Sequence, residues 1–192
     1  MSLAGEGLGR PRAVLRAPLE EGVLEGLTAG DEVIISGRLL AARDQAHKRL
    51  VDLVEQGLEL PFDPVGQIIY YVGPTPARPG RVIGAAGPTT SGRMDLLTVP
   101  LLRLGLKGLL GKGRRSGEVK KALMEHRAIY LAAFGGAGAF YAQRIRQARI
   151  LAWPELGPEA LMELMVEDFP AVVINDLSGG DLYQSGPAAW RS

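Results

Sequence analysis

The residues best suited to chemistry lie in one glycine-bounded loop, GPTTSGR (87–93), which follows an apolar run at residues 81–86. The loop offers three hydroxyls and one guanidinium. Its glycines let the backbone approach a ligand, and backbone N–H groups at a following helix start favour an anion. Arg93 can pair with a carboxylate through two parallel hydrogen bonds. The pattern therefore predicts an anion site, with an ordinary helix start capped by Ser91 or Thr90 as the alternative.

The spacing of this loop nearly matches a phosphate-binding P-loop, but its chemistry departs from that motif. Arg93 replaces the P-loop lysine, and Met94 replaces the hydroxyl that would hold magnesium. Pro88 also removes one backbone N–H from the cradle. A nucleotide triphosphatase is therefore disfavoured. A second glycine cluster imitates a dinucleotide fingerprint, but Tyr141 occupies a position that needs a small residue, so we interpret it as a tight strand-to-helix turn.

Two further cations stand at positions that suit ligand binding. Arg43 lies between a predicted strand and a predicted helix, and Lys112 lies between two glycines. Together with Arg93 they would suit a ligand with two carboxylates. The alternatives are an Arg43 that merely pairs with Asp44 and a Lys112 that is solvated. His47 lies one helical turn beyond Arg43, where a packed histidine is the simpler interpretation than a catalytic one.

Composition excludes several classes of protein. The 192 residues carry 22 basic and 21 acidic side chains, a balance that argues against a nucleic-acid binder or a membrane-surface protein. No run is long and apolar enough to cross a membrane or to form a signal core, so we expect a soluble, cytoplasmic protein. The sequence has no cysteine and two histidines, and we expect no metal site in this chain.

Apolar strands that alternate with helices predict a layered α/β domain with a mixed sheet. Strands are expected over residues 31–40, 67–73, 81–87, 128–134, 146–153 and 171–176. Helices are expected over residues 45–57 with Asp44 as N-cap, 92–106, 118–127 and 157–170, and behind a turn within 135–145. Five glycines predict a flexible loop over residues 105–117, and a turn at residues 178–180 would pair 181–184 with the last strand.

Several segments resemble the β-subunit, or C-terminal domain, of the iron–sulfur-dependent class I fumarases and L(+)-tartrate dehydratases. They are ARDQAHKR (42–49), YYVGPTPARPGRVIGAAGPTTSGRMD (70–95), GKG (111–113), FGGAGA (134–139) and FPAVVINDLSGGDLY (169–183). The similarity keeps its order over nearly the whole chain. It implies one domain over residues 1–192, an α/β swivelling β/β/α fold with a layered mixed sheet and flanking helices, and a loosely ordered arm at residues 1–15.

The resemblance also implies an activity, a cofactor and a partner. The activity is a hydro-lyase reaction, the reversible dehydration of a 2-hydroxy dicarboxylate such as malate to fumarate. In this family a [4Fe–4S] cluster acts as Lewis acid on the substrate hydroxyl, and a chain without cysteine cannot hold it. A cysteine-bearing α-subunit is therefore expected, sharing the active site in an α2β2 assembly. The alternatives are an L(+)-tartrate dehydratase β-subunit and a non-catalytic dicarboxylate-binding module.

The same resemblance assigns roles to individual positions. The substrate-binding residues of the family fall on Arg43, Thr89, Arg93 and Lys112. Thr89 is a candidate for the base that abstracts the proton, although a threonine hydroxyl is a poor base unless it is activated, and holding the substrate is the alternative role. The positions expected to support these residues from behind are His47, Thr90 and Asp95.

Overall fold

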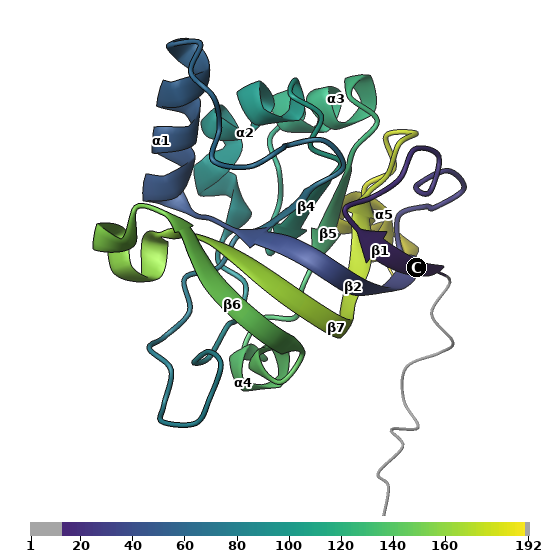
Figure 1. Cartoon of the computed structure of the whole chain (residues 1–192). Helices are drawn as coiled ribbons and strands as arrows, with labels where there is room; N and C mark the ends of the chain where they lie inside the picture. The colour runs from purple at the N-terminus through teal and green to yellow at the C-terminus, as the bar shows by residue number, and fades with distance from the viewer. Residues whose placement is uncertain (1–12, 191–192) are drawn as a thin grey trace, which may run out of the picture.

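The structure is a computed structural model that describes residues 13–190, and its strands form one mixed sheet of seven (Figure 1). The strand order is β1-β2-β3-β4-β5-β7-β6. β1 to β5 run parallel to their neighbours, whereas β7 is antiparallel to β2, β5 and β6. The strands are β1 (Ala13–Ala17), β2 (Glu32–Ala41), β3 (Ile68–Tyr70), β4 (Gly108–Gly111), β5 (Ile129–Ala132), β6 (Ile145–Ala152) and β7 (Leu161–Asn175). The predicted mixed α/β architecture is confirmed.

The sheet closes on itself because β2 pairs with β7 as well as with β1 and β3. The pairing runs from Glu32 opposite Val172 to Ala41 opposite Met162. Strands β2, β3, β4, β5 and β7 therefore form a ring. The register of β2 shifts next to Gly37, which has a φ of 110° and lies so close to the Ala17 carbonyl that no side chain fits.

Two apolar cores lie on the two faces of this ring. Successive side chains of a strand point to opposite faces, so Ile68 and Tyr70 enter the inner core whereas Ile69 and Tyr71 enter the outer one. The inner core lies between the facing parts of the folded sheet. The outer core lies between the sheet and the helices that cover it. These strands are consequently apolar on both faces, as expected of buried parallel strands.

The helices are connections between strands, and three of them cover the outer face (Figure 1). They are α1 (Asp44–Glu55), α2 (Asp95–Leu102), α3 (Gly117–Glu125), α4 (Gly138–Ala142) and α5 (Leu182–Ala189), with 3-10 turns η1 (Ser91–Met94) and η2 (Pro154–Glu159). The predicted helices at residues 45–57, 92–106, 118–127 and within 135–145 are confirmed in position. The N-cap of α1 is Arg43 rather than Asp44, and no side chain caps it.

Two glycine-rich segments differ from prediction. Residues 81–87 form an irregular segment instead of a strand, and Gly84 lies so close to Thr75 that a Cβ would come within 2.2 Å of the Thr75 carbonyl oxygen. This segment is held by the Tyr70 hydroxyl, which donates to the Ala86 carbonyl at 2.7 Å. Conversely, the expected flexible loop at residues 105–117 contains β4, where a Cβ on Gly108 would lie 2.7 Å from the side chain of Ile68. Here glycine serves close packing.

Three further expectations concern the two ends of the chain. The helix predicted at residues 157–170 is wrong, because this segment contains the end of η2 and the first ten residues of β7. The strand expected at residues 181–184 is reduced to one bridge between Asn175 and Asp181, after which α5 begins. Residues 13–15 of the expected N-terminal arm belong to β1, and residues 1–12 lie outside the described part of the chain.

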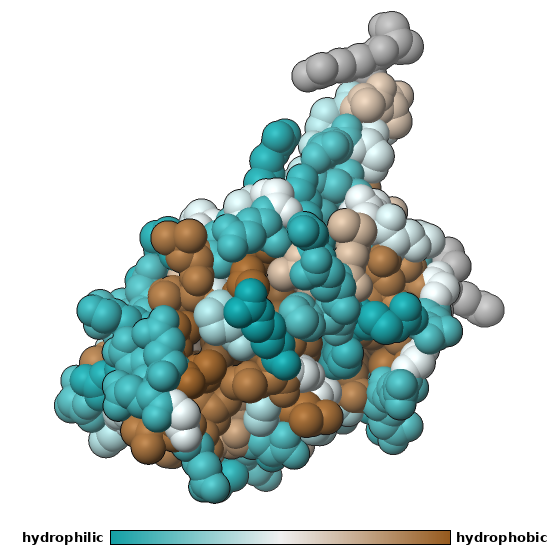
Figure 2. Space-filling view, turned by 90° about the horizontal axis from the view of Figure 1, so that it is seen from above, coloured by the Kyte–Doolittle hydropathy of each residue, from teal (hydrophilic) through white to brown (hydrophobic). Residues whose placement is uncertain are grey.

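The surface mixes apolar and hydrophilic side chains. On the face seen from above the helices, brown apolar side chains lie between teal hydrophilic ones (Figure 2). Leu58 is 54% exposed because α1 ends before it. Among residues 13–190 no helix combines the length and the apolar character needed to cross a bilayer.

Candidate functional site

The predicted site residues follow the carboxyl ends of three neighbouring parallel strands. Arg43 follows β2, Thr89 and Arg93 lie in the connection after β3, and Lys112 follows β4. The crevice outside the carboxyl ends of such strands is the usual ligand position in α/β proteins. A small pocket lined partly by Glu20, Lys107 and Arg127 contains none of these residues. The chemistry therefore points to the carboxyl edge instead of to that pocket.

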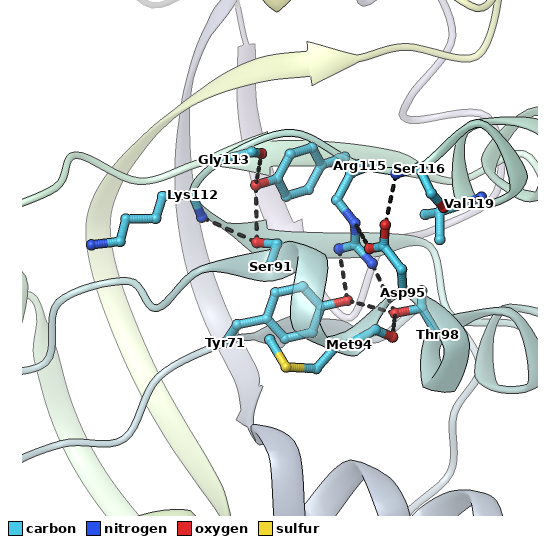
Figure 3. A network of polar contacts seen from close by, with 11 residues as sticks. Tyr71, Ser91, Met94, Asp95, Thr98, Lys112, Gly113, Arg115, Ser116 and Val119 are labelled. Carbon is cyan, nitrogen blue, oxygen red and sulfur yellow. Dashed lines mark hydrogen bonds and ion pairs between the residues drawn. The ribbon is translucent and has the colours of Figure 1, made fainter.

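The loop at residues 87–93 is tied to both neighbouring strands. The backbone N–H and the hydroxyl of Thr89 both donate to the Tyr71 carbonyl, at 2.8 Å and 2.9 Å. The N–H of Ser91 donates to the Lys112 carbonyl at 2.9 Å, and Thr90 forms a parallel bridge with Lys112. Thr90 precedes η1 without a side-chain cap, so the capped-helix alternative is wrong. The Ser91 hydroxyl instead accepts the N–H of Lys112 (Figure 3).

One carboxylate joins the two arginines of the site. Asp44 accepts Nε and one terminal nitrogen of Arg93, at 2.9 Å and 3.1 Å. The same carboxylate accepts Nε of Arg43 at 3.2 Å, and Glu159 lies 3.4 Å from a terminal nitrogen of Arg43. The structure thus brings Arg43 and Arg93 together, and the pairing of Arg43 with Asp44 that the sequence left open is confirmed.

These contacts set the charge of the site. Partial burial alone would raise the pKa of Asp44, but the hydrogen bonds from Arg93 and Arg43 outweigh it and hold the pKa below its usual value. The hydrogen bond to Asp44 in turn raises the pKa of Arg93. Asp44 is therefore a carboxylate at neutral pH, and both arginines are cations.

Lys112 presents the remaining cation of the predicted set. Its side chain is exposed, and its Nζ makes no hydrogen bond or ion pair with any of residues 13–190. The side chain points away from the polar network of the loop (Figure 3). It runs beside Gly135, where a Cβ would lie 3.9 Å from Cδ of Lys112. Thr90, predicted as a supporting position, is exposed beside it.

A buried arginine that the sequence did not single out lies in the polar network next to the loop (Figure 3). The side chain of Arg115 is fully buried and donates to Asp95 at 2.7 Å, to the Tyr71 hydroxyl at 3.0 Å and to Thr98 at 2.9 Å. Asp95 also accepts the N–H of Ser116 at 2.7 Å. Asp95 is thus linked through Arg115 to Tyr71, the residue whose carbonyl accepts from Thr89. The sequence could not show that Arg115 is buried, because it stands next to Arg114 in a glycine-rich stretch without periodicity.

His47 is a packed residue beneath the site. It is fully buried, its Nδ1 lies 3.2 Å from the Arg43 carbonyl, and its ring lies 5.2 Å from that of Tyr71. Within the described residues its Nε2 has no partner. Burial lowers the pKa of His47 to about 4, so the ring is neutral at physiological pH. Its contact with the Arg43 carbonyl fixes the first turn of α1, which carries both Arg43 and Asp44.

The chain does not supply the ligands of an iron–sulfur cluster. Such clusters are held by cysteine thiolates, and the sequence contains none. Over residues 13–190, no three His, Asp or Glu side chains gather as a metal site would require. The cations at the carboxyl edge suit an anionic ligand and are unsuited to holding a metal.

Comparison with known proteins agrees with this geometry. The family model for the fumarase C-terminus matches residues 9–186. The chain is 38% identical over 190 residues to the anaerobic class I fumarate hydratase of Escherichia coli, covering 94% of this chain and 34% of that protein. It is 41% identical over 157 residues to fumarate hydratase 2 of Leishmania major, covering 80% of this chain and 28% of that protein. It therefore spans about a third of the length of these fumarate hydratases.

A shorter relative matches over most of its own length. The chain is 34% identical over 164 residues to the putative L(+)-tartrate dehydratase subunit beta of Methanocaldococcus jannaschii, covering 82% of this chain and 84% of that protein. The match to the family model covers almost the whole chain, including every predicted site residue. The chain belongs to the fumarase C-terminus family.

Proposed function

We propose that this chain is the β part of a class I hydro-lyase that reversibly dehydrates a 2-hydroxy dicarboxylate, malate to fumarate. The observation that carries the proposal is the meeting of Arg43, Arg93 and Lys112 at one carboxyl edge, beside Thr89. The fumarate hydratases among its relatives support the reaction class. The folded sheet with one helical layer supports assignment to the swivelling β/β/α domains.

The cations suit the chemistry of such a dehydration. The proton to be removed lies beside a carboxylate and is weakly acidic, so negative charge develops there in the transition state. Preorganised positive charge stabilises that transition state more than it stabilises the substrate. Arg43, Arg93 and Lys112 would bind the carboxylates and supply this charge. Thr89 would hold the substrate, because its own proton is donated to the Tyr71 carbonyl and no described residue contacts the hydroxyl as a base.

The rest of the active site would come from a second polypeptide or domain. A cysteine-bearing α part would hold the [4Fe–4S] cluster, which acts as Lewis acid on the substrate hydroxyl when bound. The lack of cysteine in this chain and its similarity to a protein named subunit beta support that division. We propose an α2β2 assembly in the cytoplasm, with the carboxyl edge of the sheet facing the α part.

L(+)-tartrate is the second candidate substrate. It is favoured by the relative from Methanocaldococcus jannaschii, 84% of which this chain covers. Both substrates carry two carboxylates, so the same three cations suit either. A module that only binds dicarboxylates is disfavoured, because the relatives named above are fumarate hydratases and a putative tartrate dehydratase subunit.

The test is reconstitution with the cysteine-bearing α part encoded in the same genome. The two parts are combined anaerobically with iron and sulfide, and consumption of malate and of L(+)-tartrate is measured. We expect turnover of malate by the combination and none by either part alone. Turnover of tartrate alone would assign the second candidate, and an assembled, cluster-loaded complex that converts neither would reject the proposed function.

A further inference from the structure

Asp44 places a carboxylate of the protein's own between the two arginines of the candidate site. It makes three hydrogen bonds to them, at 2.9 Å and 3.1 Å to Arg93 and 3.2 Å to Arg43. These contacts join segments 49 residues apart in sequence, the start of α1 and the 3-10 turn before α2. No other described carboxylate contacts both guanidinium groups.

The contacts use only one side of each guanidinium. A guanidinium has five N–H donors in a rigid plane. Arg93 donates to Asp44 from Nε and one terminal nitrogen, which leaves the N–H groups on its other edge available for a ligand. Arg43 donates to Asp44 from Nε and pairs with Glu159 through one terminal nitrogen. Each arginine therefore keeps donors for a ligand while its plane is already fixed.

Asp44 is less exposed than Arg93, the more distant of the two arginines in sequence. It is the first residue of α1, and the next turn of that helix is anchored by the fully buried Ala46 and His47. Its side chain is short, whereas that of Arg93 is long and 47% exposed. Without a partner, a side chain of this kind must be immobilised when the ligand binds, at a cost in conformational entropy.

We infer that Asp44 is a positioning residue that orients Arg43 and Arg93 together, so that the two guanidinium groups act as one preformed clamp for a substrate carboxylate. The inference rests on the proposed function for its kinetic consequence, but the fixing of the arginines is independent of it. Glu159 has a different role, because it contacts Arg43 and the N–H of Gln45 but not Arg93.

The first test follows the Nε–H signals of Arg43 and Arg93 by NMR in the 192-residue chain alone. Asp44→Asn keeps the size of the side chain but removes its charge and one acceptor. We expect both signals to move toward those of solvent-exposed arginines and to exchange faster with water. The control is Glu155→Gln, which removes an ion pair with Arg49 of α1. Both signals should stay in place in this variant. Unchanged signals in Asp44→Asn would overturn the inference.

The second test uses the reconstituted enzyme. A misplacement of about 1 Å in a substrate-positioning group can cost about 10²-fold in rate, so we expect Asp44→Asn to lower kcat by about 10- to 100-fold. The change in KM should be small, because the lost preorganisation weakens substrate binding while the removal of a negative charge favours a dianionic substrate. Arg93→Ala, by contrast, should raise KM.

Two controls accompany the kinetic test. The amount of assembled complex and its cluster content are measured for each variant, which separates positioning from loss of assembly. Glu155→Gln should retain wild-type kcat and KM. A wild-type kcat in Asp44→Asn would contradict the inference, whereas an inactive wild-type assembly would count against the proposed function and leave the NMR comparison to decide whether Asp44 fixes the arginines.

Discussion

The charges of the candidate site nearly cancel before a ligand arrives. Arg43 and Arg93 face Asp44 and Glu159, so these four side chains sum to zero net charge. Lys112 is the cation without a carboxylate partner among residues 13–190. We therefore propose that the two arginines mainly fix the geometry of a bound dianion, and that Lys112 supplies most of the net attraction for it.

Replacing Lys112 tests this division of roles. We expect Lys112→Gln to lower kcat/KM by about 10- to 100-fold, because a hydrogen bond to a charged group is worth about 1.5–3 kcal/mol. Stability should be unchanged, since the side chain is exposed. Steady-state kinetics of the reconstituted enzyme and urea unfolding of the chain measure the two effects. Lys48→Gln, an exposed lysine of α1, is the control, and equal kinetics for both variants would contradict the assignment.

Thr89 distinguishes substrate holding from proton abstraction. Its hydroxyl donates to the Tyr71 carbonyl at 2.9 Å, so only its lone pairs face a ligand. Thr89→Val keeps the shape and removes one neutral hydrogen bond, which is worth about 0.5–1.5 kcal/mol, so we expect kcat/KM to fall by about tenfold or less. Thr89→Ser should retain nearly full activity. Complete loss of turnover in Thr89→Val with intact assembly would instead assign Thr89 as the base.

Helix α1 carries both a surface role and a buried one. Its first turn presents Arg43 and Asp44 at the carboxyl edge, and its buried face places His47 against Tyr71. A histidine that is fully buried and neutral couples the stability of this helix to pH. The site therefore rests on an element whose packing weakens in acid.

The pH dependence has a definite sign and range. Burial lowers the pKa of His47 to about 4, below its value of 6.5 in the unfolded chain, so the unfolded chain binds more protons between these values. The free energy of unfolding should fall by about 1.4 kcal/mol per pH unit as the pH drops through that window. Urea unfolding at several pH values measures it. His47→Gln should flatten the slope between pH 6.5 and about 4.

Strand β4 depends on a glycine at its last position. A Cβ on Gly111 would lie 2.1 Å from the Ser91 hydroxyl and 2.8 Å from the Tyr71 ring. We expect Gly111→Ala to destabilise the chain by about 1–3 kcal/mol through overpacking and to lower activity by displacing the adjacent Lys112. Gly117→Ala, where no atom lies within 4 Å, should cost little. Urea unfolding compares the two, and equal stability would contradict the close packing.

Elements whose apolar residues recur at one regular spacing could be predicted from the sequence. Elements whose local propensity conflicts with their tertiary pairing could not. The buried face of α1 could be predicted as helical because Leu50 and Val51 follow His47 by three and four residues. The segment at residues 157–170 also offered helix-forming residues, but pairing with β2 overrides that propensity and makes it part of β7. The glycines around β4 indicated flexibility, although they permit tight strand packing.

The site shows the same limit at finer detail. Arg43, Thr89, Arg93 and Lys112 could be predicted because they follow recognisable junctions and a specific motif. The contacts of Asp44 with Arg93 and of Arg115 with Asp95 could not, because they join segments that are brought together only by the tertiary fold. Asp44 was expected to cap a helix, and its carboxylate is used by the arginines instead.

At the scale of the molecule, the ring of strands is a scaffold that holds an incomplete site at its carboxyl edge. Two apolar cores lie on its two faces, so the carboxyl ends of β2, β3 and β4 have fixed relative positions. We propose that the residues at that edge bind a dianion, and this chain carries no cysteine for an iron–sulfur cluster. The molecule is accordingly suited to serve as one wall of a site that a partner completes.

The cluster offers a test at this scale. Anaerobic reconstitution of the chain alone with iron and sulfide should yield no [4Fe–4S] absorption or stoichiometric bound iron, since the sequence has no thiolate ligand. The same treatment in the presence of the cysteine-bearing α part should load the complex. Iron and sulfide analysis after gel filtration measures both. A stoichiometric cluster on the isolated chain would contradict the proposed division between the two parts.

The closure of the sheet by β7 also dictates when this protein can acquire its shape during synthesis. Val33 pairs with Ala171, so the ring joins residues from opposite ends of the chain. Bringing such distant segments together carries a loop-closure entropy that only the completed inner core repays. On the ribosome, β2 to β5 emerge before their closing strand exists and expose apolar surface until it arrives. Nascent chains that stop before Leu161 should therefore bind chaperones and be cleaved readily by proteases.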